Sequence, residues 1–206
     1  MDIWQKWEEW YSSLGINPKD ICHDGIVNEN KDIYANLQQR VLFVLRDTND
    51  ARGNDLLDLL RTGPRYQTWH TIARWAAGIL NKFPHYSQID KLDVMSETLK
   101  NVAVINLKKK AGRSSADLNE INLFAFQDRQ LLRKQIECIN PNIIVACGTF
   151  DSVLWLLEPS FDSSNIDKHF ARKDDLTILS WYHPTRVNNE QSYEDLRRLW
   201  NKAMLH

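Results

Sequence analysis

A short apolar run, Val41 to Leu45, passes directly into the polar residues Arg46 to Asp50. A continuous apolar run bounded by turn-forming residues is typical of a strand buried on both faces of a sheet. Ligands of open parallel α/β sheets bind beyond the carboxyl ends of the strands. The run therefore predicts a buried strand with Arg46, Asp47, Thr48, Asn49 and Asp50 at the mouth of a site. The alternative is that Asp47 and Asp50 only cap the following helix, a common position for aspartate.

Three further apolar runs have the same character. They cover residues 102–107, 142–146 and 176–182, and helix-like segments separate them. Strands that alternate with helices are typical of α/β proteins with a mostly parallel sheet. We expect a three-layer α/β/α fold around a central, mostly parallel four-stranded sheet.

Helical periodicity is clearest over residues 66–81, where Trp69, Ile72, Ala76 and Ile79 share one stripe. Similar but weaker patterns predict helices over residues 89–100 and 131–139, and the polar residues 158–175 predict an exposed loop. We expect one domain over residues 1–206, with a helical extension (1–40), a core (41–187) and a closing helix (188–206).

The first helix, over residues 1–14, carries Trp4, Trp7 and Trp10 at a spacing of three. This spacing favours a face that packs on the body of the protein. The alternative is that these rings stack on nucleobases, as tryptophan can.

Composition restricts the partners. The net charge of −1 provides no global basic field for nucleic acid, so any such contact must come from local patches. The three cysteines are widely spaced, which argues against a zinc or iron–sulfur site and favours a reducing, cytoplasmic compartment. No apolar run is long enough to cross a membrane, and no signal peptide is apparent.

Polar residues at the other strand ends are the next candidates. Asn106 interrupts the second apolar run, and an unpaired buried amide costs about 1–3 kcal/mol, so it needs partners. It either faces a ligand or bonds to nearby backbone. The cationic loop that follows suggests contact with phosphate through Lys108, Lys109 and Arg113. Cys147 lacks an apparent activating base, which favours an inert thiol.

The last apolar run leads into His183-Pro184-Thr185-Arg186, where proline fixes the backbone behind the histidine. In order along the chain, the residues after the first run, Asn106, the segment from Leu131 to Gly148 and this His-Pro-Thr sequence resemble the uracil-DNA glycosylase superfamily. The resemblance spans residues 41 to about 187. It departs from the family in the first motif, where Leu45, Thr48 and Asn49 replace a glycine, a proline and a tyrosine or glycine.

The resemblance implies a uracil-DNA glycosylase-like fold and the removal of uracil or another deaminated base from DNA. Asp47 would stabilise positive charge on the sugar and orient water, as carboxylates do in sugar hydrolases. His183 would stabilise the departing base anion, and the amide groups of Asn106 and Asn49 would bind the flipped base. Arg186 would join the lysines in contacting DNA. No metal or organic cofactor would be needed, and a monomer is expected.

Two other functions remain open from the sequence. A non-catalytic protein that binds nucleic acid or a nucleotide would fit the altered first motif and the near-neutral charge. A small-molecule nucleoside hydrolase would also fit that charge. The presence of Asp47, Asn106 and His183 together favours the glycosylase, since a binder gains nothing from a carboxylate that repels phosphate.

Overall fold

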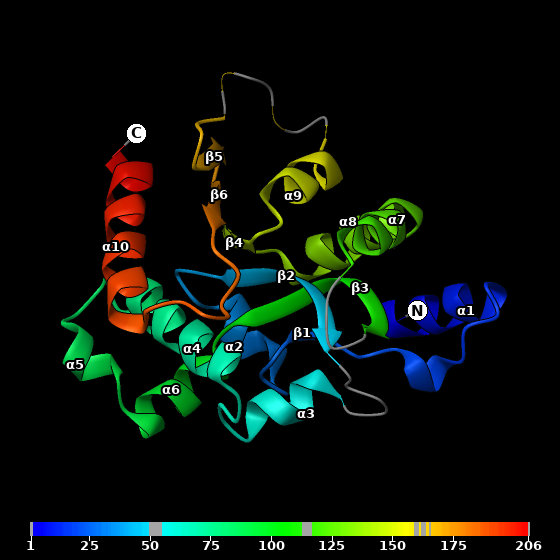
Figure 1. Ribbon diagram of the computed structural model, residues 1–206, viewed down its shortest axis with the longest axis horizontal. Coiled ribbons are helices and arrows are strands. Elements are labelled where there is room, and N and C mark those ends of the chain that lie inside the picture. The colour runs from blue at the N-terminus through cyan, green and yellow to red at the C-terminus, as the bar shows by residue number, and fades with distance from the viewer. Residues whose placement is uncertain are drawn as a thin grey trace.

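The computed structural model describes residues 2–49, 55–112, 117–158, 161, 164 and 166–205 (Figure 1). Within these residues the strands form one mixed sheet of six strands in the order β1-β3-β2-β4-β6-β5. The strands, in chain order, are β1 (Gly25–Ile26), β2 (Val41–Asn49), β3 (Ala103–Gly112), β4 (Ile143–Cys147), β5 (Phe170–Lys173) and β6 (Leu176–Trp181).

Helices occupy most of the remaining described chain. They are α1 (Ile3–Ser13), the 3₁₀ turn η1 (Pro18–Asp20), α2 (Lys31–Ala35), α3 (Leu56–Arg61), α4 (Gln67–Leu80), α5 (Tyr86–Ile89), α6 (Leu92–Leu99), α7 (Leu118–Gln127), α8 (Arg129–Ile139), α9 (Phe150–Leu156) and α10 (Asn189–Leu205). None of the described helices combines the length and apolarity needed to span a bilayer.

The four predicted strands form the parallel centre of the sheet, β3-β2-β4-β6. The expectation of a four-stranded sheet is wrong, because β1 and β5 add antiparallel edges. Strand β1 has only two residues, and β5 lies in the segment expected to be a loop. Short, polar edge strands give little of the apolar pattern on which strand prediction depends.

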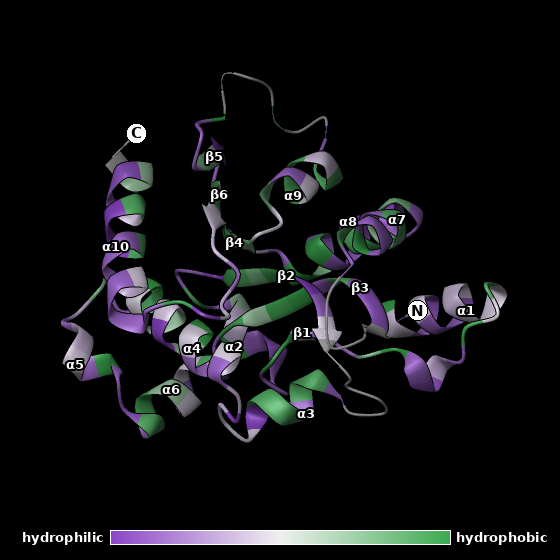
Figure 2. Ribbon diagram, in the orientation of Figure 1, coloured by the Kyte–Doolittle hydropathy of each residue, from purple (hydrophilic) through white to green (hydrophobic). Residues whose placement is uncertain are grey.

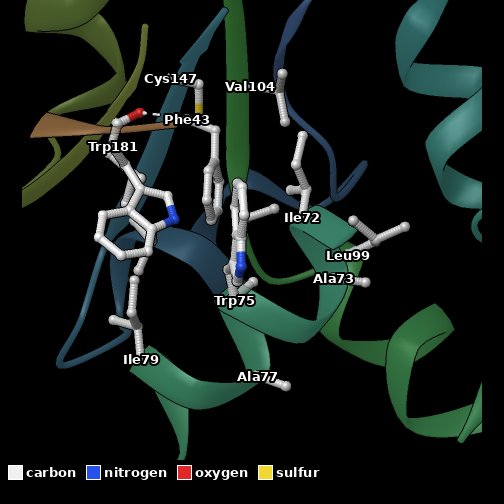
Figure 3. Packing of buried hydrophobic residues seen from close by; sticks show 14 of the residues in the cluster. Phe43, Ile72, Ala73, Trp75, Ala77, Ile79, Leu99, Val104, Cys147 and Trp181 are labelled. Carbon is white, nitrogen blue, oxygen red and sulfur yellow. Dashed lines mark hydrogen bonds between the residues drawn. The ribbon is translucent and has the colours of Figure 1, made fainter. Parts of the chain in front are cut away.

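Alternate residues of β2 enter two hydrophobic clusters. Val41, Phe43 and Leu45 pack with helices α3, α4, α6 and α10, whereas Leu42 and Val44 pack with α1, α7, α8 and α9. Helices therefore cover both faces of the sheet, and Figure 2 shows hydrophobic colour concentrated on the central strands. Phe43 is fully buried beside Trp75 and Trp181, as Figure 3 shows.

The segment before residue 41 is more than an extension. Trp7 and Tyr11 of α1 have no exposed surface, and β1 belongs to the sheet. The packing interpretation of the tryptophan-rich helix is confirmed for Trp7. The helices predicted over residues 66–81, 89–100 and 131–139 correspond to α4, α6 and α8.

The connections between strands define a switch point in the sheet. The chain passes from β2 to β3 through α3, α4 and α6 on one face, then from β3 to β4 through α7 and α8 on the other. The first connection thus leads to one side of β2, and the second crosses over β2 to its other side. In such sheets the crevice beyond the carboxyl ends of the two strands at this point, here β2 and β4, is where ligands bind.

Candidate functional site

Strands β2 and β3, which the first connection joins, both continue past the turns that the sequence predicts after them. Strand β2 runs through Asn49, and β3 runs through Gly112 across the lysines expected to form a loop. The two strands pair with each other there, with Asp47 opposite Lys108 and Asn49 opposite Gly112, and the register shifts between them. Asp47 is therefore held on a strand rather than in a helix cap, so the capping alternative is wrong for Asp47.

The carboxylate of Asp47 is partly buried at this end of the sheet. Burial raises its pKa, Glu120 raises it further, and the cations of Lys108 and Arg46 lower it. The balance lies above the ordinary value for aspartate. Ionisation of Asp47 is thus less favourable in the folded protein than in water. Shifted pKa values of this kind are common among groups that act in catalysis.

Arg46 extends from β2 across the turn that follows β4. Its Nε donates to the carbonyl oxygen of Gly148 at 3.4 Å, a long hydrogen bond. Gly148 has φ +68°, and a Cβ added there would lie 2.9 Å from Nη2 of Arg46. Only glycine therefore meets both the backbone conformation and the close approach of the guanidinium.

His183 follows β6 and forms the other side of this region. Its Nδ1 lies 2.9 Å from the hydroxyl oxygen of Thr185. Burial and the positive charge of Arg46 lower the pKa of His183, which favours a neutral ring at pH 7. If the Thr185 hydroxyl donates to Nδ1, the ring proton resides on Nε2, which can then donate to a ligand.

We call Arg46, Asp47, Gly148, His183 and Thr185 the strand-end site. Strand β4 lies between β2 and β6 in the sheet. Two inter-strand spacings, about 9–10 Å, therefore separate the backbones that carry the acid and the imidazole. The positive charge of Arg46 lowers the pKa of both Asp47 and His183.

An open hollow of about 410 Å³ adjoins the Gly148 turn. Its lining residues are Gly148, Thr149, Phe150, Asp151, Ser152, Lys168 and Ser180. Asp47 and His183 do not line this hollow, and Arg46 contacts one of its lining residues, Gly148.

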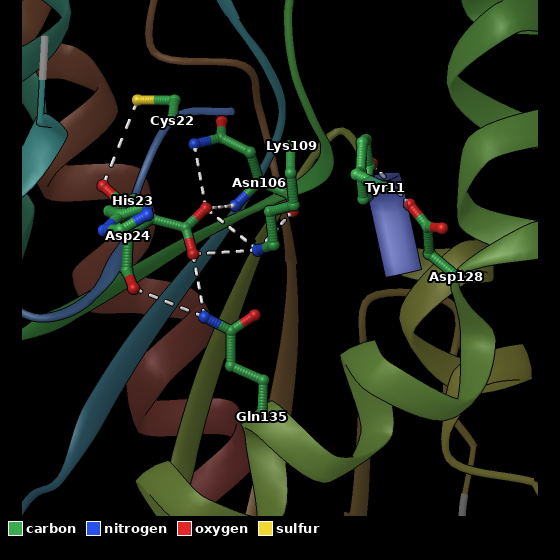
Figure 4. A network of polar contacts seen from close by, with 8 residues as sticks. All are labelled: Tyr11, Cys22, His23, Asp24, Asn106, Lys109, Asp128 and Gln135. Atoms are coloured by element: carbon green, nitrogen blue, oxygen red, sulfur yellow. Dashed lines mark hydrogen bonds and ion pairs between the residues drawn. The ribbon is translucent and has the colours of Figure 1, made fainter. Parts of the chain in front are cut away.

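Asn106 pairs with Leu45, the residue before Arg46, but its side chain is enclosed, which argues against the expectation that it binds a base. Its backbone N–H donates to Oδ2 of Asp24 at 2.8 Å, and its Nδ2 donates to the same oxygen at 3.4 Å (Figure 4). The residue is 1% exposed, and its Oδ1 has no hydrogen-bond partner. The amide is enclosed at the β1 edge of β3 and presents no surface to a flipped base.

Lys109 belongs to the same enclosed cluster, which corrects its expected contact with DNA. Its Nζ lies 2.8 and 2.9 Å from the carboxylate oxygens of Asp24 and donates to the carbonyl of Asn106 at 2.9 Å. The rings of Trp4 and Trp7 lie 5.9 and 5.3 Å from Nζ. An ammonium with no exposed surface cannot reach a phosphate.

The side chain of Lys108 is also buried and paired within the protein. It is 3% exposed and forms an ion pair of 3.0 Å with Glu120 of α7. The expected phosphate contact is therefore not supported for Lys108. Arg186 is exposed in the loop after His183, with φ +60°. The side chain of Asn49, and all of Asp50 and Arg113, lie outside the part of the chain that the structure describes.

One other sequence-based interpretation can now be judged. Cys147 is fully buried, and burial raises the pKa of its thiol, so the inert interpretation is confirmed. No group of three or more His, Cys, Asp or Glu side chains in the described ranges is placed to hold a metal ion.

Sequence reasoning placed Arg46 at the mouth of the site without giving it a role there, and it missed Glu120. The available signals were a cation next to the strand-end acid and a glycine directly after the third apolar run. No family model matches the chain, and no significant match is found among curated proteins.

Proposed function

We propose that this protein hydrolyses the N-glycosidic bond of uracil or another deaminated base in DNA, with Asp47 and His183 as its catalytic residues. The observation that carries the proposal is their common placement. A partly buried carboxylate after the core of β2 and a histidine after β6 stand at the carboxyl edge of one parallel sheet, and the charge of Arg46 acts on both. This edge includes the switch point, where ligands bind in α/β sheets.

The chemistry follows from the charges that develop as the bond breaks. The sugar becomes positively charged, and an ionised Asp47 stabilises that charge and orients the attacking water. The base leaves with negative charge, and Nε2–H of a neutral His183 donates to its oxygen. Water supplies a hydroxyl group to the sugar carbon, and its remaining proton is taken up by the departing base. The lowered pKa of His183 supports this assignment, because it keeps the ring neutral at pH 7.

The burial of Asn106 changes how the base would be recognised. The resemblance implies that this amide binds the edge of the base, but the amide is enclosed in this chain. Selectivity would then depend on other groups near the strand-end site, and we propose no specific base on this ground. Because Lys108 and Lys109 are buried, Arg186 would make the phosphate contacts that were expected of them.

A second candidate is a nucleotide-binding protein without hydrolytic activity. The hollow beside Gly148 favours it, because Lys168, Ser152 and Ser180 line that hollow without Asp47 or His183. Arg46 beside the acid also suits an anionic ligand.

Oligonucleotides that carry one uracil, hypoxanthine or xanthine test the proposal. Each is incubated with the protein, and hot alkali then cleaves the strand wherever a base has been lost. The glycosylase predicts cleavage with at least one of these bases, and its loss in Asp47→Asn. Binding to all three without cleavage supports the second candidate. Release of base from free nucleosides, but not from DNA, supports a small-molecule nucleoside hydrolase.

A further inference from the structure

Lys108 and Asp47 are direct partners on the parallel strands β3 and β2. The Lys108 side chain is 3% exposed, although an ammonium in that position loses nearly all its hydration. Glu120 compensates for this loss with an ion pair of 3.0 Å, and the Phe124 ring centroid lies 5.3 Å from Nζ. Both of these contacts come from α7. Helix α7 therefore holds the lysine in place next to the acid.

Three charged groups among the described residues act on the carboxylate of Asp47. Lys108 acts from β3, Glu120 from α7 and Arg46 from the same strand as the acid. Glu120 is 47% exposed at its side chain, whereas Lys108 is 3% exposed. Water screens the exposed glutamate more than the buried lysine, so Glu120 offsets only part of the field of Lys108.

We propose that the ion pair of Lys108 and Glu120 is a positioning device for Asp47. Lys108 stabilises the ionised form of the Asp47 carboxylate in the strand-end site. Glu120 fixes the position of the lysine and weakens its effect on that carboxylate. This inference rests on the proposed function of Asp47 and deepens it. Lys108 is a positioning residue, and its role replaces the phosphate contact that its sequence suggests.

A purely structural role makes a different prediction. If the pair only fastens α7 to β3, its removal lowers stability and leaves the titration of Asp47 unchanged. The positioning device predicts shifts of opposite sign. Loss of the Lys108 charge raises the pKa of Asp47, and loss of the Glu120 charge lowers it.

The experiment follows the side-chain carboxyl carbon of Asp47 by NMR as pH is varied. The variants are Lys108→Met, Lys108→Arg and Glu120→Gln, and Asp47→Asn assigns the signal. Lys134→Met and Glu137→Gln serve as controls, because they disrupt an exposed pair of the same type on α8. We expect the Asp47 midpoint to rise by about 1 pH unit in Lys108→Met, since a nearby cation typically shifts a carboxyl pKa by about 1–3 units. It should fall in Glu120→Gln, return toward the parent value in Lys108→Arg and stay constant in both controls.

An unchanged midpoint in Lys108→Met, or a rise in Glu120→Gln, overturns the inference. Glu120→Gln removes a partly exposed charge and keeps the test decisive if Lys108→Met does not fold. The NMR measurement also separates this inference from the proposed function. If the Asp47 midpoints shift as expected but the protein releases no base, the glycosylase activity is contradicted and the positioning device is supported. If the protein releases base but the Asp47 midpoints do not shift, the glycosylase activity is supported and the positioning device is contradicted.

Discussion

The ammonium of Lys109 lies 2.8 and 2.9 Å from the two carboxylate oxygens of Asp24, and neither side chain is exposed. Asp24 also accepts from the backbone and side chain of Asn106 and from Nε2 of Gln135 on α8 (Figure 4). Burial lowers the pKa of Lys109, and Asp24 opposes that shift. This cluster joins the β1 edge of the sheet to α8 and encloses Asn106 and Lys109.

We expect Lys109→Met to lower the free energy of unfolding by about 3–5 kcal/mol, because it leaves the charge of Asp24 buried without its partner. Urea denaturation followed by tryptophan fluorescence measures the change. Lys134→Met, at the exposed pair with Glu137, should cost no more than about 1 kcal/mol. The double variant Asp24→Asn/Lys109→Met should recover part of the loss. Equal costs for the buried and the exposed lysine would contradict a structural role for the cluster.

Asp47→Asn should stabilise the fold while it removes activity. The folded-state pKa of Asp47 is raised, so its favourable contribution is present below the unfolded-state pKa and is lost as pH rises through the folded-state value. At pH 7 the charged carboxylate therefore weakens the fold. A gain of about 1 kcal/mol would raise Tm by roughly 2–4 °C for a chain of this size. The gain should disappear near pH 3, where both states are largely protonated. A lower Tm at pH 7 would show that the carboxylate is stabilised by contacts other than these charges.

Arg46→Gln should move the acid limb of the activity profile to higher pH. Arg46 lowers the pKa of Asp47 and of His183, and activity requires the first to be ionised and the second to be neutral. Without this cation both pKa values rise, so both groups reach the active state at higher pH. Profiles of kcat/KM against pH provide the measurement, and Arg198→Gln, on the exposed face of α10, is the control. A shift of the acid limb to lower pH would contradict the effect of the Arg46 charge on the two groups.

Gly148→Ala and Gly15→Ala form a matched pair. Both glycines have positive φ, +68° and +73°, so alanine carries a similar backbone cost of about 1–2 kcal/mol at each. No atom lies within 4 Å of an added Cβ at Gly15, whereas Nη2 of Arg46 lies 2.9 Å from one at Gly148. Gly148→Ala should therefore cost more in urea denaturation and should also displace Arg46, which shifts the pH profile. Equal costs with an unchanged profile would show that Arg46 is not held at the turn.

The sequence predicts the central strands well because each apolar run carries its own signal. Strands β2, β3, β4 and β6 begin within about two residues of their predicted positions. Strands β1 and β5 were missed because their stability comes from their neighbours rather than from their own residues. The extension of β3 through Lys108 and Lys109 was missed for a related reason, since charged residues rarely form buried strand segments.

The candidate site was only partly predictable. The positions of Asp47 and His183 follow from strand ends, which is a local property. The fate of Asn106 depends on Asp24, which is 82 residues earlier in the chain, and Lys109 pairs with the same aspartate across 85 residues. No local pattern marks such pairs. The same applies to Glu120, whose role depends on how α7 packs on β3.

The most direct test of the account is the measurement of free base released from a uracil-containing oligonucleotide, by chromatography, for the parent protein, Asp47→Asn, His183→Gln and Asn106→Ala. The account predicts release by the parent and losses of at least about 100-fold in Asp47→Asn and His183→Gln, as removal of catalytic groups typically causes. Asn106→Ala, where it folds, should keep most of the parent rate, because its amide is enclosed and cannot reach a ligand. No release by the parent with any deaminated base, or release that survives Asp47→Asn, would contradict the account.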